Sequence, residues 1–203
     1  MRHPISLALI LLAGTALHST SAHAGGIGLL GTAGMHQARV YYYDADDTQY
    51  LNRQNKLNKG FGIEAVLGDK DDRFLGVARG YFLQDTPPDG PNDPLVSDPT
   101  YAVPEGTTNM GVATVGVHWG IIGDPTGFQA HIVSNIGAGI VTVDSTTGEG
   151  SSQEFLIGEA GIGAHYHFAR NLQVYADVVY TMRYRKSFSP GANGFLGFRY
   201  MFD

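Results

Sequence analysis

The chain of 203 residues contains no cysteine. This absence excludes disulfide bonds, thiolate metal sites and a cysteine nucleophile. It also excludes the lipidated cysteine that anchors a bacterial lipoprotein. Beyond residue 24 the sequence has no apolar run of about 18 residues, so no membrane-spanning helix is expected there.

Basic residues are scarce as well. Lysine and arginine number 13 against 19 acidic residues, which gives a formal net charge of −6. Binding to a phosphate backbone needs a basic surface, so nucleic acid is not expected as a partner. Much of the acid lies in residues 43–47 and 85–98, which we predict to be loops.

The N-terminal segment has the pattern of a secretory signal. Arg2 and His3 precede an apolar stretch at residues 5–17, and Ala22-His23-Ala24 matches a cleavage site. The apolar stretch is shorter than the roughly 20 residues that a spanning helix needs. We therefore predict a signal peptide at residues 1–24 and a single mature domain at residues 25–203, with a retained anchor helix as the alternative.

Glycine is abundant, with 28 residues scattered through apolar stretches, which suits tightly curved strands. No convincing helical period is found. Strand-length runs of alternating character recur instead, and we count eight. They lie at residues 27–42, 60–68, 73–83, 110–122, 128–143, 155–168, 172–184 and 194–202.

The connections between these runs alternate in length. Those at residues 69–72, 123–127 and 169–171 are short, whereas those at 43–59, 84–109, 144–154 and 185–193 are long and rich in polar residues, proline or glycine. Short periplasmic turns and long extracellular loops are typical of bacterial outer-membrane barrels. The sequence thus predicts an all-β fold, an eight-stranded antiparallel up-and-down transmembrane barrel with both termini on the periplasmic side.

The polar faces of the predicted strands combine single charges with small residues. A charge enclosed in a barrel is tolerable only when it is paired and hydrogen-bonded. Eight strands leave an interior just wide enough for side chains to fill. We therefore predict a lumen closed by a charge network of Arg39, Glu64, Arg79, Glu159, Asp177, Arg183 and Arg199.

Aromatic residues gather near the predicted strand ends. Such positions suit the two aromatic belts of a membrane protein, although ordinary β-propensity also enriches tyrosine and phenylalanine. The residues are Tyr41, Tyr42, Tyr81, Phe82, Trp119, Phe128, Tyr166, Phe168, Tyr180 and Tyr184.

The last predicted strand carries a resemblance to a known family. Leu196, Phe198, Tyr200 and Phe202 alternate toward the C-terminus, which resembles the signature read by the barrel-assembly machinery in Gram-negative outer-membrane proteins. Asp203 departs from that signature because it makes Phe202 penultimate. The chain is similar to the OmpA/OmpX/OmpW-like group of small barrels. This resemblance implies contact with outer-membrane lipid and lipopolysaccharide, but it implies no particular activity.

One segment resembles part of a catalytic motif. His131 and Ser134 superficially resemble the His-x-Ser-Asn segment of the PagL-type lipid A deacylases, but their separation is three residues. In a regular strand that offset places the two side chains on opposite faces, and only a β-bulge would bring them together. We predict that His131 is a hydrogen-bonding residue of the lumen.

Two groups of residues have types that could bind a metal ion. His165 and His167 share one strand face, with His118, His131 and Glu159 on neighbouring inward faces, but luminal polar packing is the favoured interpretation. The acidic residues of the second long loop lack the spacing of a calcium loop, so a solvated loop is favoured there; they are Asp85, Asp89, Asp93 and Asp98. We predict no catalytic, cofactor or metal site.

The leading hypothesis for function is a non-catalytic outer-membrane barrel with a structural or surface-interaction role. The tyrosine-rich, acidic stretch at residues 41–47 suits an outward-facing loop that contacts a surface or envelope protein partner, and it suits an aromatic girdle at the membrane interface equally well. The alternatives are a narrow, porin-like channel for small solutes, a lipid A-modifying enzyme, and the membrane anchor of a larger envelope complex.

Overall fold

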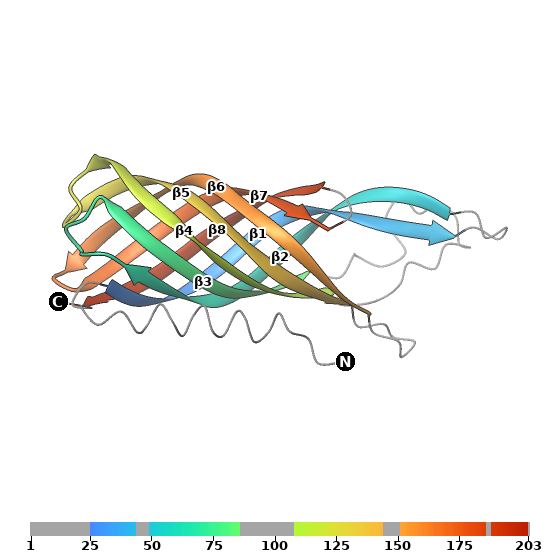
Figure 1. Cartoon of the computed structure of the whole chain (residues 1–203), viewed down its shortest axis with the longest axis horizontal. Coiled ribbons are helices and arrows are strands. Elements are labelled where there is room, and N and C mark those ends of the chain that lie inside the picture. Colours follow the sequence, from blue (N-terminus) through green and yellow to red (C-terminus); the bar gives the residue numbers. More distant parts are fainter. Residues whose placement is uncertain (1–24, 44–48, 86–107, 144–150, 186–187, 203) are drawn as a thin grey trace.

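The computed structural model describes residues 25–43, 49–85, 108–143, 151–185 and 188–202. Its eight strands form a closed barrel in which each strand is antiparallel to both neighbours and the first pairs with the last (Figure 1). The predicted fold class is confirmed. The predicted signal peptide lies outside the described residues. Within them, no helix is long and apolar enough to cross a membrane.

The strands follow one another around the barrel in chain order. Their bounds are β1 Gly25–Tyr43, β2 Gln49–Leu67, β3 Phe74–Asp85, β4 Thr108–Gly123, β5 Phe128–Val143, β6 Ser151–Ala169, β7 Leu172–Tyr184 and β8 Phe188–Phe202. β1 and β8 form the closing seam, from Gly25 opposite Phe202 to His36 opposite Gly191.

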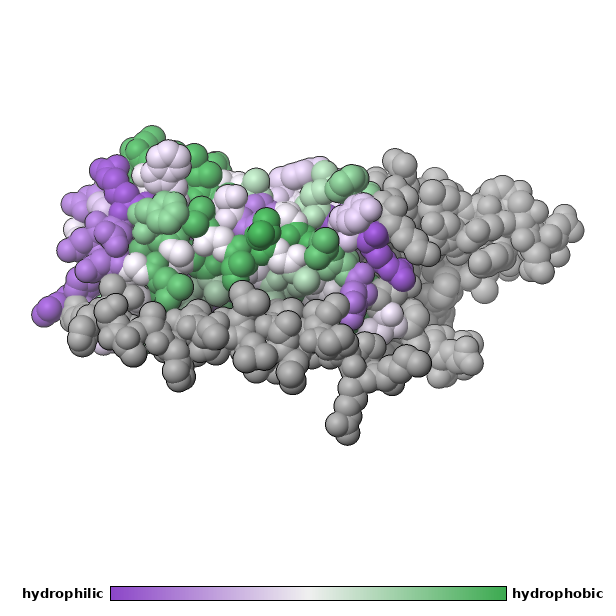
Figure 2. All heavy atoms as spheres, in the orientation of Figure 1, coloured by the Kyte–Doolittle hydropathy of each residue, from purple (hydrophilic) through white to green (hydrophobic). Residues whose placement is uncertain are grey.

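The outer surface of the barrel is apolar. Because side chains alternate along a strand, β7 exposes 64 % of Val178 while only 1 % of the neighbouring Asp177 is exposed. The same alternation in the other strands leaves large aliphatic and aromatic residues exposed on their outer faces. Figure 2 shows hydrophobic residues over the body of the barrel and hydrophilic ones at its left-hand end. A closed barrel with this outer surface is suited to lipid.

Several strands are longer than the sequence predicts. β2 begins at Gln49 instead of residue 60, β6 at Ser151 and β8 at Phe188. The predicted loops at residues 43–59, 144–154 and 185–193 are therefore partly strand, and the connections there are shorter than predicted. These extensions are held by backbone pairing and contain many polar residues, so they lack the alternation on which the prediction relied.

The extension of β1 and β2 leaves the barrel wall. β1 pairs with β8 only as far as His36, and β2 pairs with β3 only from Asn58 onward. Residues 37–43 of β1 and 49–57 of β2 lie beyond these pairings, and the two strands remain paired with each other from Gln37 opposite Asn55 to Tyr43 opposite Gln49. We call this segment the β1–β2 ribbon. It projects beyond the other strands in Figure 1, and within the described part of the chain it pairs with no third strand.

The inside of the barrel is more apolar than predicted. The larger cluster of buried apolar side chains contains Leu30, Tyr81, Leu83, Met110, Val112, Val133, Phe155, Ile157, Tyr175, Val179 and Phe195. A smaller cluster of Val66, Leu75 and Met201 lies near the end of the barrel where Gly25 pairs with Phe202. Tyr81, which we expected in an aromatic belt, is buried in the lumen because β3 turns Arg79, Tyr81 and Leu83 inward.

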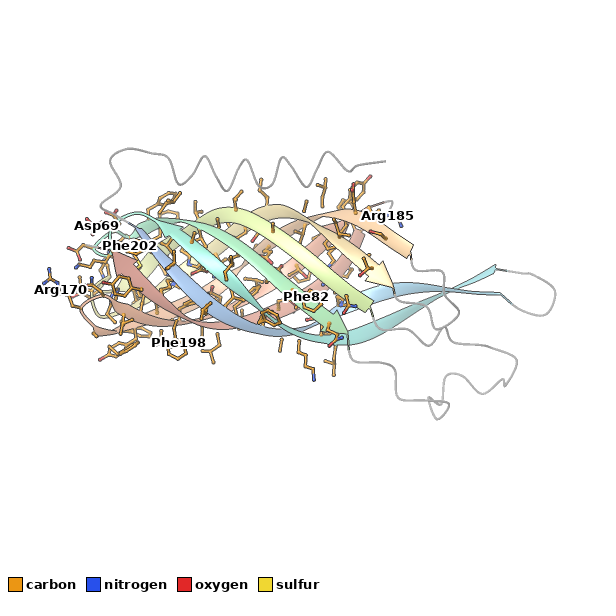
Figure 3. All side chains as sticks on the ribbon, turned by 90° about the horizontal axis from the view of Figure 1, so that it is seen from below. Asp69, Phe82, Arg170, Arg185, Phe198 and Phe202 are labelled. Atoms are coloured by element: carbon orange, nitrogen blue, oxygen red, sulfur yellow. The ribbon has the colours of Figure 1, made fainter. Side chains whose placement is uncertain are left out.

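Short turns join the strands at the end that holds the C-terminus. In the turn between β4 and β5, Gly123 adopts a positive φ of 98°, a conformation that favours glycine. The backbone N–H and the hydroxyl of Thr126 both donate to Asp124 Oδ1, at 2.9 and 2.8 Å. These hydrogen bonds hold the pKa of the Asp124 carboxyl below its usual value. Figure 3 shows Asp69 and Arg170 at this end and Arg185 at the opposite end.

Candidate functional site

Four charged residues meet in the lumen and form what we call the ion network, Glu64, Arg79, Asp177 and Arg199. Glu64 on β2 lies opposite Arg79 on β3, and Arg79 Nε donates to Glu64 Oε2 at 2.5 Å. Arg199 on β8 donates from Nε to the other carboxylate oxygen at 2.5 Å. Arg79 also donates from a terminal nitrogen to Asp177 on β7. All four side chains are fully buried.

Two histidines extend this network to further strands. His131 on β5 contacts Asp177 Oδ1 through Nε2 at 2.9 Å, and the carboxylate accepts the bond. His118 on β4 accepts a bond from Arg79 at its Nε2, at 3.1 Å. The two imidazole rings are stacked with centroids 4.5 Å apart. The network thus links six of the eight strands across the interior.

The charges of the ion network balance. Two carboxylates face two guanidinium groups, which is the condition under which buried ions are tolerated. Aromatic rings lie over both cations. The Cζ atom of Arg199 is 4.1 Å from the centre of the Tyr175 ring, and that of Arg79 is 4.8 Å from the centre of the Phe195 ring. Together with the apolar clusters, this arrangement obstructs the lumen with packed side chains.

Gly163 provides the space for this arrangement. A Cβ atom at Gly163 would collide with Asp177 Oδ1 and would lie 2.6 Å from His131 Nε2. The hydrogen bond between His131 and Asp177 therefore depends on the missing side chain.

Replacement of Gly163 by alanine is expected to lower the free energy of unfolding by about 1–3 kcal/mol, because overpacking displaces buried groups. The matched control is Gly158→Ala on the same strand, where an added Cβ meets no atom within 4 Å. Urea unfolding in detergent, followed by the fluorescence of Trp119, measures both. Equal stability of the two variants would contradict the proposed packing role of Gly163.

The remaining predicted luminal residues form a separate group farther from the C-terminal end. Glu159 accepts hydrogen bonds from the Tyr81 hydroxyl at 2.6 Å and from the Asn135 amide at 2.9 Å. Arg183 donates to Met110 Sδ at 3.2 Å and lies 5.7 Å from the Phe155 ring centre. Arg39 belongs to the β1–β2 ribbon, and its side chain lies outside the described residues.

The structure separates the residues of the deacylase-like segment. His131 is buried in the lumen, whereas Ser134 is exposed on the outer face of β5. The pairing of β5 with β6 runs through this segment without a register shift. No bulge brings the imidazole to the hydroxyl, so this pair does not form a nucleophile and its base.

His118, His131 and Asp177 bring potential ligand atoms within 4.8 Å of one another. Arg79 already donates to both His118 and Asp177 at this point. Because the guanidinium supplies the positive charge that the carboxylate requires, these three residues do not fit a metal centre. The acidic residues Asp89, Asp93 and Asp98, for which a solvated loop was predicted, lie outside the described residues, as does the side chain of Asp85.

Comparison with known proteins tests the fold. No family model matches the chain, and no curated protein matches its sequence. Among solved structures, neisserial surface protein A superposes with a TM-score of 0.52 over 86 % of this chain and 96 % of that protein, at 10 % identity. The chain has the fold of a small outer-membrane β-barrel. At this level of identity the likeness shows the fold alone.

Two further structures are similar at lower TM-scores. Ail of Yersinia pestis gives 0.48 at 15 % identity and covers 89 % of this chain and 99 % of its own. The N-terminal barrel domain of Pseudomonas aeruginosa OprF gives 0.41 at 13 % identity and covers 85 % and 97 %. The apolar outer surface places this barrel in a membrane, and barrels of this kind span the outer membrane of Gram-negative bacteria.

Sequence reasoning missed several participants in the site. Gln173 accepts a bond from Arg199 at 2.9 Å, and Tyr175 stacks on the same guanidinium. Both residues share the inward face of β7 with Asp177, as the period of two predicts, but the predicted network omitted them because it was built from charged residues alone. The predicted assembly-signal residues all lie exposed on the outer face of β8, and their recognition remains a prediction; they are Leu196, Phe198, Tyr200 and Phe202.

Proposed function

We propose that this outer-membrane barrel has a structural or surface-interaction role and carries no catalytic centre. The observation that carries the proposal is the β1–β2 ribbon, which extends the hairpin well past the last pairing with β3 and β8. A barrel that only spans lipid does not need such an extension. The ribbon lies at the end opposite the short turns, which is the extracellular end in barrels of this class.

The packed lumen supports the same proposal against a channel. A porin-like route would need a continuous polar passage, and here Arg79 reaches across the interior from Glu64 to Asp177. Steady conductance of the folded barrel in planar bilayers would contradict this part of the proposal.

The ribbon is proposed to contact a surface or envelope protein. Its sequence, QARVYYY in β1 followed by QYLNRQNKL in β2, is rich in tyrosine and amide residues. Such residues provide large contact areas and hydrogen bonds at protein interfaces. Its outer edges also carry backbone groups that neither β3 nor β8 occupies.

Site-specific photo-crosslinking on intact cells tests this role. A benzophenone amino acid at position 41 in the ribbon is expected to give a discrete adduct with one protein. The same probe at Phe61, which is exposed on the outer face of β2, is expected to contact lipid and give no such adduct. Mass spectrometry of the two samples identifies the partner.

A shortened variant provides the control for binding. Deletion of residues 37–55 with an Asn-Gly connection leaves the pairing of β1 with β8 and of β2 with β3 intact. This variant should retain the heat-modifiable gel migration of a folded barrel and lose at least tenfold in binding to the identified partner. If position 41 gives no protein adduct, or if the shortened barrel binds as well as the full chain, the surface-interaction role is wrong.

Further contacts follow from this proposal. The exposed outer face would contact outer-membrane lipid and lipopolysaccharide, and the outward side chains of β8 would be read by the barrel-assembly machinery. Residues 1–24 would act as the signal peptide that directs export. We propose no nucleic-acid partner, since the chain is acidic.

A further inference from the structure

Four histidines form a row in the part of the lumen that lies near the short turns. In order they are His118, His131, His165 and His167, with successive ring centroids 4.5, 5.6 and 5.7 Å apart. All four are buried, although they come from three different strands. The ion network uses only the first two.

Hydrogen bonds fix the orientation of the two middle rings. His131 Nε2 contacts the Asp177 carboxylate at 2.9 Å, and His165 Nε2 contacts the backbone carbonyl of Pro125 at 3.3 Å. Both acceptors require a proton on Nε2, so a neutral ring carries its lone pair on Nδ1. In each residue the Nδ1 atom is buried and has no hydrogen-bond partner among the described residues.

This is the arrangement found around metal-binding histidines. A histidine that binds a metal usually donates its other N–H to a carboxylate or a backbone carbonyl, which fixes the tautomer and the ring orientation. A zinc–nitrogen bond is about 2.1 Å long, so two imidazoles on one tetrahedral ion have centres roughly 5 Å apart. The spacing of 5.6 Å between His131 and His165 fits this requirement.

We propose that His131 and His165 bind a divalent transition-metal ion of the class that prefers imidazole, represented by Zn²⁺, through their Nδ1 atoms. Gln129 lies directly opposite His165 in the strand register, is almost fully buried and offers an amide oxygen as a further ligand. Asp177 and the Pro125 carbonyl orient the two rings from behind. The site differs from the grouping of His118, His131 and Asp177, where Arg79 takes the place of a cation.

A cavity at the rim of the barrel is the proposed entry route to the site. It has a volume of about 310 Å³ and is lined by Lys70, Thr126, His167, Phe168, Ala169 and Arg170. His167, which lines this cavity, contacts the His165 ring edge-on with ring centroids 5.7 Å apart. The positive charges of Arg79 and Arg199 near the route are balanced by Glu64 and Asp177.

Calorimetric titration of the detergent-folded full chain with ZnCl₂ tests the proposal. One ion per barrel is expected to bind the wild type. His165→Gln is expected to weaken binding at least tenfold, and Asp177→Asn about tenfold or more through the lost orientation of His131. His36→Gln is the matched control, because His36 is also buried in the lumen but bonds Asn58 far from the site. Heat-modifiable gel migration shows which variants are folded.

A spectroscopic measurement keeps the test independent of the variants. Cu²⁺ added to the wild type should give an electron paramagnetic resonance spectrum with hyperfine splitting from two imidazole nitrogens. The proposal is overturned if the folded wild type binds no Zn²⁺. It is equally overturned if binding survives His165→Gln but is lost in His118→Gln, because the ion would then lie among His118, His131 and Asp177.

Discussion

Replacement of Arg79 by methionine is expected to lower the free energy of unfolding by about 3–5 kcal/mol, the usual effect of removing one partner from a buried ion pair. Arg79 is the only one of the four network residues that contacts both carboxylates. Without it, Asp177 retains His131 and Glu64 retains Arg199, but two negative charges face one guanidinium among fully buried side chains. Urea titration in detergent, followed by the shift in gel migration, measures the loss.

Two further variants show whether the loss of stability comes from the buried charge. Arg185→Met removes an exposed arginine just beyond β7 and is expected to change stability by about 0.5 kcal/mol or less. Adding Asp177→Asn to Arg79→Met removes the uncompensated charge and is expected to recover part of the loss. If Arg79→Met costs less than about 1 kcal/mol, the ion network is not a main support of the barrel.

Introduction of a charge on the outer face is expected to have a comparable effect. Ile162 on β6 is 67 % exposed and lies opposite Ile132 and Val178 at mid-strand, so it faces the centre of the bilayer. Ile162→Arg is expected to destabilise the barrel by about 2–4 kcal/mol in lipid vesicles, because a cation at the bilayer midplane loses its hydration. Guanidinium unfolding in vesicles measures this change.

The control for this substitution lies on the same face of the same strand. Phe168 is exposed close to the turn after β6, so Phe168→Arg is expected to cost only about 0–1 kcal/mol. The depth dependence is the informative result. Equal and small effects at both positions would mean that the outer face contacts water, and the membrane placement would fail.

The strand number and the inward faces of β4, β6, β7 and β8 could be predicted because lipid imposes a period of two. Leu172, Val174 and Ala176 are outward and apolar, while Asp177 is inward, so the alternation can be recognised from the sequence alone. The ends of the strands could not be predicted in this way. Beyond the lipid both faces of a strand meet water, and the stretch QYLNRQNKL that begins β2 carries no alternation.

The partners of the luminal charges also could not be predicted. Whether Glu64 binds Arg79, Arg199 or both depends on the register between strands that close the barrel, which no local pattern encodes. The apolar interior was missed for a related reason. Val112 on β4 and Phe195 on β8 lie on the predicted inward faces, but which apolar side chains meet inside the lumen depends on how the strands are arranged around the closed barrel.

The seam between β1 and β8 restricts the order in which this protein can fold. The contact between Glu64 and Arg199 joins residues 135 positions apart. A nascent chain that lacks its final strand therefore leaves the long edge of β1 without a neighbour and one side of Glu64 without its cation. Closure of the cylinder and neutralisation of its interior are consequently late events, and the polypeptide must be kept from aggregating until residues 191–202 arrive.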